Sequence, residues 1–114
     1  MQPVWTAAIL AGGRARRLGG VDKSALVVGG RSILDRQVAV LRSLTPHILI
    51  VASEEDRFRD AGVRVVRDRI PRAGSLGGLY TALVVAPTEQ LVVIACDMPF
   101  LTAPFLSRLA ALGA

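Results

Sequence analysis

The chain reads Leu10-Ala-Gly-Gly-Arg-Ala-Arg-Arg-Leu-Gly-Gly-Val-Asp-Lys23 directly after an apolar run from Val4 to Leu10. The run predicts a buried strand, and the glycines after it let a backbone approach a ligand closely. Clustered arginines and a lysine favour a multiply charged anion. Lys23 is the single lysine among 14 basic residues, which suggests that a compact, flexible charge is needed there. We expect this glycine-rich segment, residues 10–23, to hold the phosphates of a nucleotide; a solvated surface loop is the alternative.

The bulk composition describes one small domain, residues 1–114, with an aliphatic core, because 52% of the residues are hydrophobic and only 4% aromatic. The net charge of +5 suits an anionic small molecule or a nucleic acid, but the arginines are dispersed and few aromatic residues could stack on bases. The single cysteine, Cys96, excludes an intramolecular disulfide and a multi-cysteine metal site. No signal peptide or membrane-spanning run is evident, so we expect a cytoplasmic protein.

Apolar runs alternate with amphipathic segments, which predicts βα units and a mainly parallel sheet of at least four strands in a three-layer α/β fold. The expected strands cover residues 4–10, 48–52, 63–66 (an edge strand) and 91–95 (the most clearly buried one), with a short extended piece at 25–28. Helices are expected after an N-cap at Ser32, briefly at residues 54–56, over residues 79–85, and around Pro104. The first buries Leu34, Val38 and Leu41 and ends by Pro46; residues 68–78 are expected to be irregular.

Two carboxylates directly follow expected strands. Asp97 comes just after residues 91–95, where open α/β sheets bind ligands, and it could hold Mg²⁺ or cap the next helix. The first and the 91–95 strands should be neighbours, which brings Asp97 near the glycine-rich segment and favours the metal role. Asp68 ends the 63–66 strand and could accept hydrogen bonds from a sugar hydroxyl or a base amine. Its alternative is a simple turn leading into Gly74-Ser-Leu-Gly-Gly78.

The common phosphate-binding and nucleophile motifs are absent. Asp22 precedes Lys23, so there is no Gly-Lys-Ser/Thr of a P-loop, and no Gly-x-Gly-x-x-Gly occurs. A lone cysteine without an obvious base is seldom a nucleophile, so Cys96 reads as a buried strand residue. His47, the single histidine, reads as a strand-start residue.

Five motifs together resemble the molybdenum cofactor guanylyltransferases, the MobA-like branch of the small nucleotidyltransferases. They are Leu10-Ala-Gly-Gly13, Arg17-Leu-Gly-Gly20, Asp22-Lys23, Gly74-x-Leu-Gly-Gly78 and Ala95-Cys-Asp-Met-Pro-Phe100. The first motif is shared by many nucleotide-sugar and cytidylyl transferases. The last, combined with Asp22-Lys23, is more specific.

The resemblance implies a Rossmann-like fold that joins the GMP part of GTP to the phosphate of molybdopterin with Mg²⁺, releasing pyrophosphate. It implies that the nucleotide meets the backbone of Leu10, Ala11, Gly12 and Gly13. Arg17 and Lys23 would neutralise the triphosphate and the leaving pyrophosphate. Asp68 would contact the nucleoside, and Asp97 would hold Mg²⁺ beside the α-phosphate.

The chain departs from that family at three places. Ser75 stands where the family usually has proline, and Ser53 is the nearest match to its nucleotide-side asparagine. The family's C-terminal half, which completes the sheet and much of the cofactor-side surface, is lacking. A sibling transferase using CTP or another nucleotide, and a truncated, non-catalytic nucleotide-binding module, are therefore kept as alternatives. An open sheet edge would also favour self-association.

Overall fold

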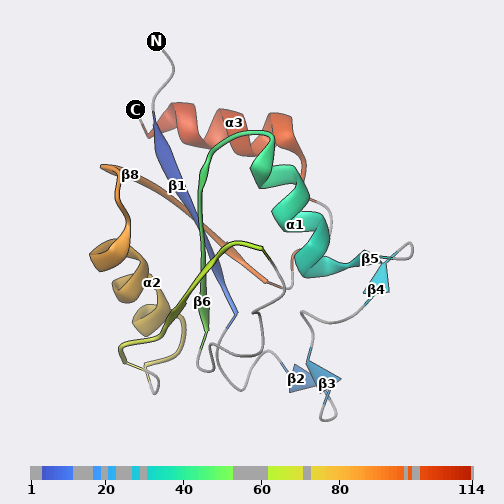
Figure 1. Ribbon diagram of the computed structural model, residues 1–114, viewed down its shortest axis with the longest axis vertical. Helices are drawn as coiled ribbons and strands as arrows, with labels where there is room; N and C mark the ends of the chain where they lie inside the picture. The colour runs from blue at the N-terminus through green and yellow to red at the C-terminus, as the bar shows by residue number, and fades with distance from the viewer. Residues whose placement is uncertain are drawn as a thin grey trace.

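The structure is a computed structural model that describes residues 4–11, 17–18, 21–22, 27–28, 31–52, 62–70, 73–96, 98 and 101–113. Its centre is a four-stranded parallel sheet in the order β7-β6-β1-β8 (Figure 1). The strands are β1 (Trp5–Leu10), β6 (His47–Ala52), β7 (Arg64–Arg67) and β8 (Gln90–Ala95). Three helices accompany it: α1 (Ile33–Arg42), α2 (Gly74–Val85) and α3 (Ala103–Leu112).

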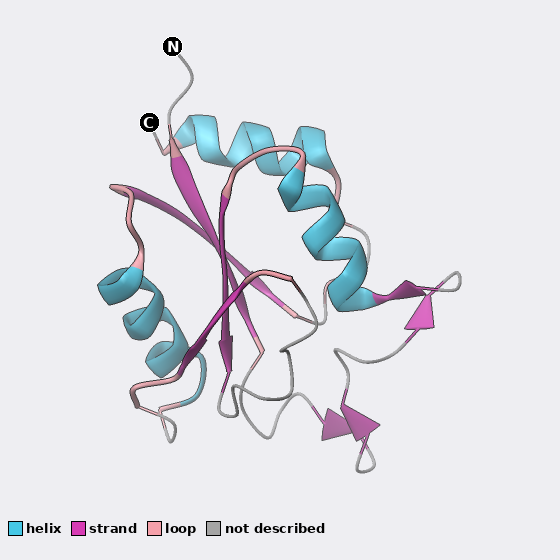
Figure 2. Cartoon of the chain, viewed as in Figure 1, coloured by secondary structure: helices cyan, strands magenta, loops and turns pink. Residues whose placement is uncertain are grey.

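The helices cover both faces of the sheet, with α1 and α3 on one side and α2 on the other (Figure 2). Alternate side chains of β1 account for this: Trp5, Ala7 and Ile9 pack with α1 and α3, whereas Ala8 and Leu10 pack with α2. All six residues of β1 are buried because the strand lies between two others and two helical layers. The predicted three-layer parallel fold is confirmed.

Two small antiparallel pairs lie between β1 and α1 in sequence. In one, β2 (Arg17–Leu18) pairs with β3 (Val21–Asp22); in the other, β4 (Val27–Val28) pairs with β5 (Arg31–Ser32). The extended piece expected at residues 25–28 is thus confirmed for its last two residues, and the capping side chain expected at Ser32 lies outside what the structure describes.

Helix α1 follows its predicted pattern. Leu34, Val38 and Leu41 are buried in the core shared with β1, and the helix ends at Arg42, before Pro46. The turn into β6 is fixed by Thr45, whose buried hydroxyl donates to the carbonyl oxygen of Trp5 at 2.6 Å. This bond ties the end of α1 to the start of β1.

Helix α2 begins at Gly74, five residues earlier than the sequence predicted, so the expectation of irregular structure is wrong for residues 74–78. The prediction failed because glycine is a poor helix former, and three glycines fall in this stretch. Two of them are there because the helix packs closely. A Cβ at Gly77 would collide with the carbonyl oxygen of Ile70, and one at Gly78 would lie 3.2 Å from Leu10 Cδ2.

The edges of the sheet are β7, as predicted, and β8, which within the described sheet pairs with β1 alone. Because β8 is an edge strand, only Val92 and Ile94 of its residues are buried. The prediction that it is the most clearly buried strand is wrong, since all six residues of β1 are buried. Pro104 occupies the first turn of α3, as predicted, where Thr102 caps the helix by accepting from the Phe105 amide. The helix expected at residues 54–56 lies outside the described residues. No helix in the described ranges is long and apolar enough to cross a membrane.

Candidate functional site

The carboxyl edge of the sheet brings three predicted site segments together. At this edge the backbone hydrogen bonds of the sheet continue for one residue past the ends of β1, β7 and β8. The Ala11 amide donates to Val51 O at 2.8 Å, the Cys96 amide to Leu10 O at 3.2 Å, and the Asp68 amide to Ala52 O at 2.9 Å. Because all four strands are parallel, the chain after β1, β7 and β8 leaves the sheet on this one side (Figure 1). This is the side on which open α/β sheets bind ligands.

Leu10 and Ala11 are the described part of the glycine-rich segment beside β1. Both are buried, and the Leu10 side chain packs against Gly78 of α2. The Leu10 carbonyl and the Ala11 amide are already hydrogen bonded within the sheet. A ligand at this edge would therefore meet the backbone that follows them, as the motif implies for Gly12 and Gly13, which lie outside the described residues.

Asp68, directly after β7, has one carboxylate oxygen fixed by the protein. Its Oδ1 accepts from the Ile70 amide at 2.9 Å and lies 3.3 Å from the hydroxyl of Thr81. The first bond reaches two residues ahead, the geometry of an Asx turn. Among the bonds between described residues none uses Oδ2, so that oxygen can accept from a ligand hydroxyl or amine. The turn that was the alternative for Asp68 therefore exists and orients the carboxylate.

Thr81 supports this turn from α2, and the sequence analysis did not single it out. Its fully buried hydroxyl accepts from the Arg69 amide at 2.9 Å and can donate to Gly77 O at 3.0 Å or to Asp68 Oδ1. One buried hydroxyl thus connects the turn after β7 to the first turns of α2. A threonine in an otherwise apolar helix was the available signal.

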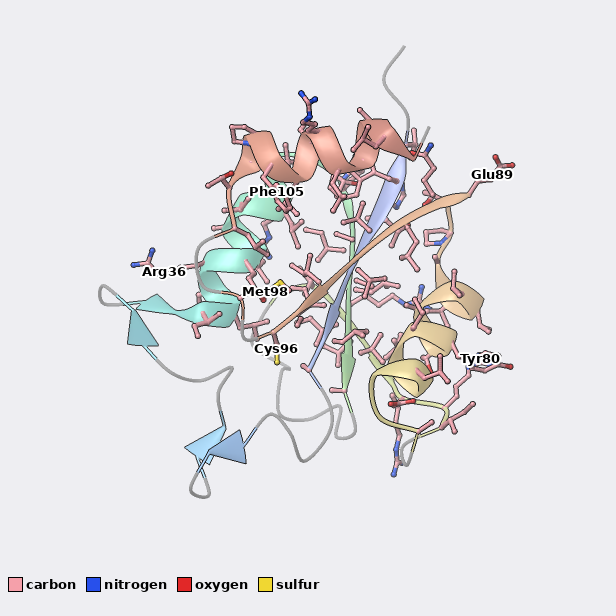
Figure 3. The ribbon with its side chains drawn as sticks, turned by 180° about the vertical axis from the view of Figure 1, so that it is seen from behind. Arg36, Tyr80, Glu89, Cys96, Met98 and Phe105 are labelled. Atoms are coloured by element: carbon pink, nitrogen blue, oxygen red, sulfur yellow. The ribbon has the colours of Figure 1, made fainter. Side chains whose placement is uncertain are left out.

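The turn after β8 is held from α1 by Gln37. Its Nε2 donates to Ala95 O at 2.8 Å and to Met98 O at 2.9 Å. Figure 3 shows Cys96 and Met98 at this end of β8, beside α1, with Glu89 at the other end. Gln37 was not predicted from the sequence, although it stands three residues after Leu34 on the apolar face of α1, where a polar residue is unexpected.

Most of the predicted charged groups lie outside the described part of the chain. Lys23, Asp97 and Ser53 do so entirely, and Arg17 is described only by its backbone, which pairs in β2 opposite Asp22. Their roles stay predictions. Across the described ranges no group of three or more His, Cys, Asp or Glu side chains is placed to hold a metal ion.

Of the two residues set aside as non-catalytic, His47 lies at a strand start as predicted, whereas Cys96 is buried as predicted but follows its strand. Cys96 is fully buried one residue after β8, in the core under α1 and α3. His47 is the first residue of β6, at the end of the sheet away from the candidate site. Among the described residues of the carboxyl edge, the Asp68 carboxylate is thus the side-chain group placed to bind a ligand, and the Thr81 hydroxyl supports it.

Curated relatives match this chain over most of its length. A probable molybdenum cofactor guanylyltransferase of Pelotomaculum thermopropionicum is 40% identical over 103 residues, 90% of this chain and 49% of the relative. A molybdenum cofactor guanylyltransferase of Mesorhizobium japonicum is 39% identical over 112 residues, 90% of this chain and 52% of the relative. The chain therefore spans about half the length of these relatives.

Solved structures share the fold. A nucleotidyl transferase from Methanothermobacter has a TM-score of 0.78 at 23% identity over 95% of this chain and 57% of that one. A cytidylyltransferase from Leptospira borgpetersenii has a TM-score of 0.70 at 22% identity over 97% of this chain and 49% of that one. The family model described as the MobA-like NTP transferase domain matches residues 7–114. This chain accordingly belongs to the MobA-like NTP transferase family.

Proposed function

We propose that this chain provides the nucleotide-binding part of a guanylyltransferase, which transfers GMP from GTP to molybdopterin and releases pyrophosphate. The names of the curated relatives support this choice of reaction. The observation that carries it is the meeting of three segments at one edge of the sheet: the start of the glycine-rich segment, the oriented Asp68, and the turn after β8.

Each segment has a distinct part in binding the nucleotide. The glycine-rich segment receives the nucleotide along the backbone that follows Leu10 and Ala11, at Gly12 and Gly13. Arg17 and Lys23 balance the negative charge of the triphosphate. Asp68 accepts a hydrogen bond from the nucleoside through its Oδ2, and its Oδ1 is fixed by the Asx turn, so the acceptor is oriented before the ligand arrives.

We place Mg²⁺ beside the turn after β8, held chiefly by substrate phosphates. Mg²⁺ is usually bound by one or two carboxylates together with phosphate oxygens and water, not by an all-protein cage. The described residues offer no such cage, and the carbonyls of Ala95 and Met98 are both occupied by Gln37. Asp97 would then supply the carboxylate. When bound, the ion would neutralise phosphate charge during the transfer.

The transfer needs no protein nucleophile. A phosphate oxygen of molybdopterin forms a bond to the α-phosphorus of GTP while the bond from that phosphorus to the β-phosphate oxygen breaks, and pyrophosphate carries away the electron pair. The chain's own residues hold the nucleotide in line for this attack. Arg17 and Lys23 stabilise the charge that builds on the leaving group. Catalysis thus depends on positioning and charge.

A calorimetric titration of the chain with GTP and Mg²⁺ tests the proposal, with CTP and ATP as comparisons. We expect selective GTP binding that is lost in Asp97→Ala. Because a cytidylyltransferase shares this fold, preference for CTP would favour the sibling transferase. Selective GTP binding without pyrophosphate release when molybdopterin is supplied would favour a non-catalytic module. Equal or absent binding of all three nucleotides would contradict the guanylyl assignment.

A further inference from the structure

Gln37 is a buried polar residue on a helix face that is otherwise apolar. The pattern of α1 predicts a hydrophobic residue at this position. Gln37 is 2% exposed and stands on the face of α1 that buries Leu34, Val38 and Leu41. Its Oε1 is buried and accepts no hydrogen bond from the part of the chain that the structure describes. Burying an acceptor without a donor lowers stability, and a leucine on this face would carry no such cost. What glutamine adds is the pair of N–H donors on Nε2.

Both donors are directed at one short stretch of chain. One bonds Ala95 O and the other Met98 O, and the Met98 amide itself lies 3.3 Å from Ala95 O. Cys96, the residue after Ala95, is anchored to β1 because its backbone amide donates a hydrogen bond to Leu10 O. The turn is therefore tied to the sheet by backbone hydrogen bonds on one side and to α1 by the Gln37 amide on the other. Between Cys96 and Met98 in sequence stands Asp97.

The helix that carries this amide is itself firmly placed. Leu34, Val38 and Leu41 anchor α1 in the core that includes β1 and β8. Because the Gln37 backbone is already held between these packed residues, its side chain loses little further conformational entropy when it binds the turn. The restraint on the turn is accordingly set by the packed core and not by the turn's own short sequence.

We propose that Gln37 is a positioning residue: its amide holds the backbone carbonyls of Ala95 and Met98, which flank Asp97 in sequence, and so restrains the segment that carries this carboxylate. This restraint is a property of the fold. Its consequence for Mg²⁺ rests on the proposed function, in which Asp97 holds that ion. Gln37 acts through the turn and touches neither nucleotide nor metal.

The test replaces the Gln37 side-chain amide with an apolar group and keeps the side-chain volume similar. Gln37→Met retains an unbranched side chain of similar length and removes both donors, and Gln37→Asn is a second variant whose shorter amide does not reach both carbonyls. Val38→Ala is the matched control, because it removes core contacts from the neighbouring position and leaves both bonds to the turn. Amide hydrogen exchange is measured in the nucleotide-free chain under conditions where every variant stays folded.

In Gln37→Met we expect the amides of Cys96 and Met98 to exchange at least about tenfold faster than in wild type, since each lost bond to the turn is worth about a factor of ten in its opening. Val38→Ala should leave their rates unchanged relative to the rest of the sheet. Wild-type rates at both amides in Gln37→Met overturn the proposal. If that variant does not fold, the same comparison in Gln37→Asn decides.

A second readout links this restraint to the metal. The Mg²⁺ concentration that gives half-maximal GTP binding should rise about tenfold in Gln37→Met, while GTP binding in EDTA stays at the wild-type value. An equal rise in Val38→Ala would show that the effect is general destabilisation and would overturn the positioning role. If the wild-type chain shows no Mg²⁺-dependent GTP binding, the proposed function fails, and the exchange rates still decide whether Gln37 restrains the turn.

Discussion

Gly77 lies so close to the carbonyl oxygen of Ile70 that a Cβ at position 77 would collide with that backbone atom. The same Cβ would lie 3.3 Å from Asp68 Oδ1. The start of α2 and the turn that orients Asp68 therefore share one closely packed contact. A backbone oxygen cannot move aside as the end of a flexible side chain can, so a larger residue must displace either the helix or the turn.

We expect Gly77→Ala to lower the free energy of unfolding by about 1–3 kcal/mol, the usual cost of overpacking a core. It should also weaken GTP binding, because the turn that carries Asp68 must shift. Urea unfolding and calorimetry measure the two effects. Gly78→Ala is the matched control: its Cβ would lie 3.2 Å from Leu10 Cδ2, which can move, and alanine gains about 1 kcal/mol of helix propensity. Equal losses of unfolding free energy and of GTP affinity in Gly77→Ala and Gly78→Ala would contradict this account.

Asp68→Asn tests the acceptor assigned to the nucleoside. The asparagine oxygen can keep the bond to the Ile70 amide, so stability should change little, while an amide NH₂ replaces the oxygen that faces the ligand. Loss of a hydrogen bond to a charged group costs about 1.5–3 kcal/mol, so GTP affinity should fall about tenfold or more.

The matched control for Asp68→Asn is Glu89→Gln, which removes the same charge from an exposed residue at the opposite end of β8 (Figure 3). We expect its GTP affinity to stay at the wild-type value. A similar loss of affinity in both variants would mean that Asp68 acts only through the net charge.

Lys23→Ala tests the phosphate role of the chain's single lysine. Affinity for GTP should fall about tenfold or more, the worth of a charge-assisted hydrogen bond, while affinity for GMP should change much less because GMP lacks the β- and γ-phosphates. Calorimetric titration with GTP and with GMP measures the loss of affinity for each nucleotide. Arg108→Ala, an exposed cation of α3, should leave both affinities unchanged. Equal losses for GTP and GMP in Lys23→Ala would place the lysine elsewhere on the nucleotide.

Thr45→Val tests the bond between the end of α1 and the start of β1. It leaves the Trp5 carbonyl without its buried donor, so the free energy of unfolding should fall by about 1–3 kcal/mol. Ser43→Ala is the comparison, since that exposed hydroxyl bonds Val40 O at 2.6 Å within the same turn and its loss should cost about 0.5 kcal/mol or less. Chemical denaturation followed by the fluorescence of the single tryptophan, Trp5, measures both variants. A smaller loss in Thr45→Val than in Ser43→Ala would show that the 2.6 Å bond to Trp5 does not stabilise the fold.

The sequence predicted the four strands of the central sheet because aliphatic runs are local signals of burial, whereas the two-residue strands β2, β3 and β5 carry no such run and were not predicted. Leu34, Val38 and Leu41 likewise revealed the buried face of α1 by spacing alone. What it could not show are contacts made across the fold. The helical glycines of α2 depend on Ile70 and Leu10, and the edge position of β8 depends on which strands pair beside it.

The same distinction applies to the candidate site. Asp68 was predicted because it directly follows a strand, and that position can be recognised from the sequence alone. Thr81 and Gln37 were not, because Asp68 stands 13 positions from Thr81 and Ala95 stands 58 positions from Gln37 in sequence. A polar residue on an apolar helical face is a usable signal, but only the fold identifies the group that it bonds.

The central strand β1 obtains its two neighbours at very different times as the chain is synthesised. Its pairing with β6 can form once the first half has emerged, whereas its pairing with β8 joins Trp5 to Gln90, close to opposite ends of the chain. Closing so large a loop is a slow step in folding. Until β8 arrives, one side of β1 exposes unpaired backbone groups that can template aggregation. The interval before β8 joins is therefore the period in which a nascent chain most needs protection.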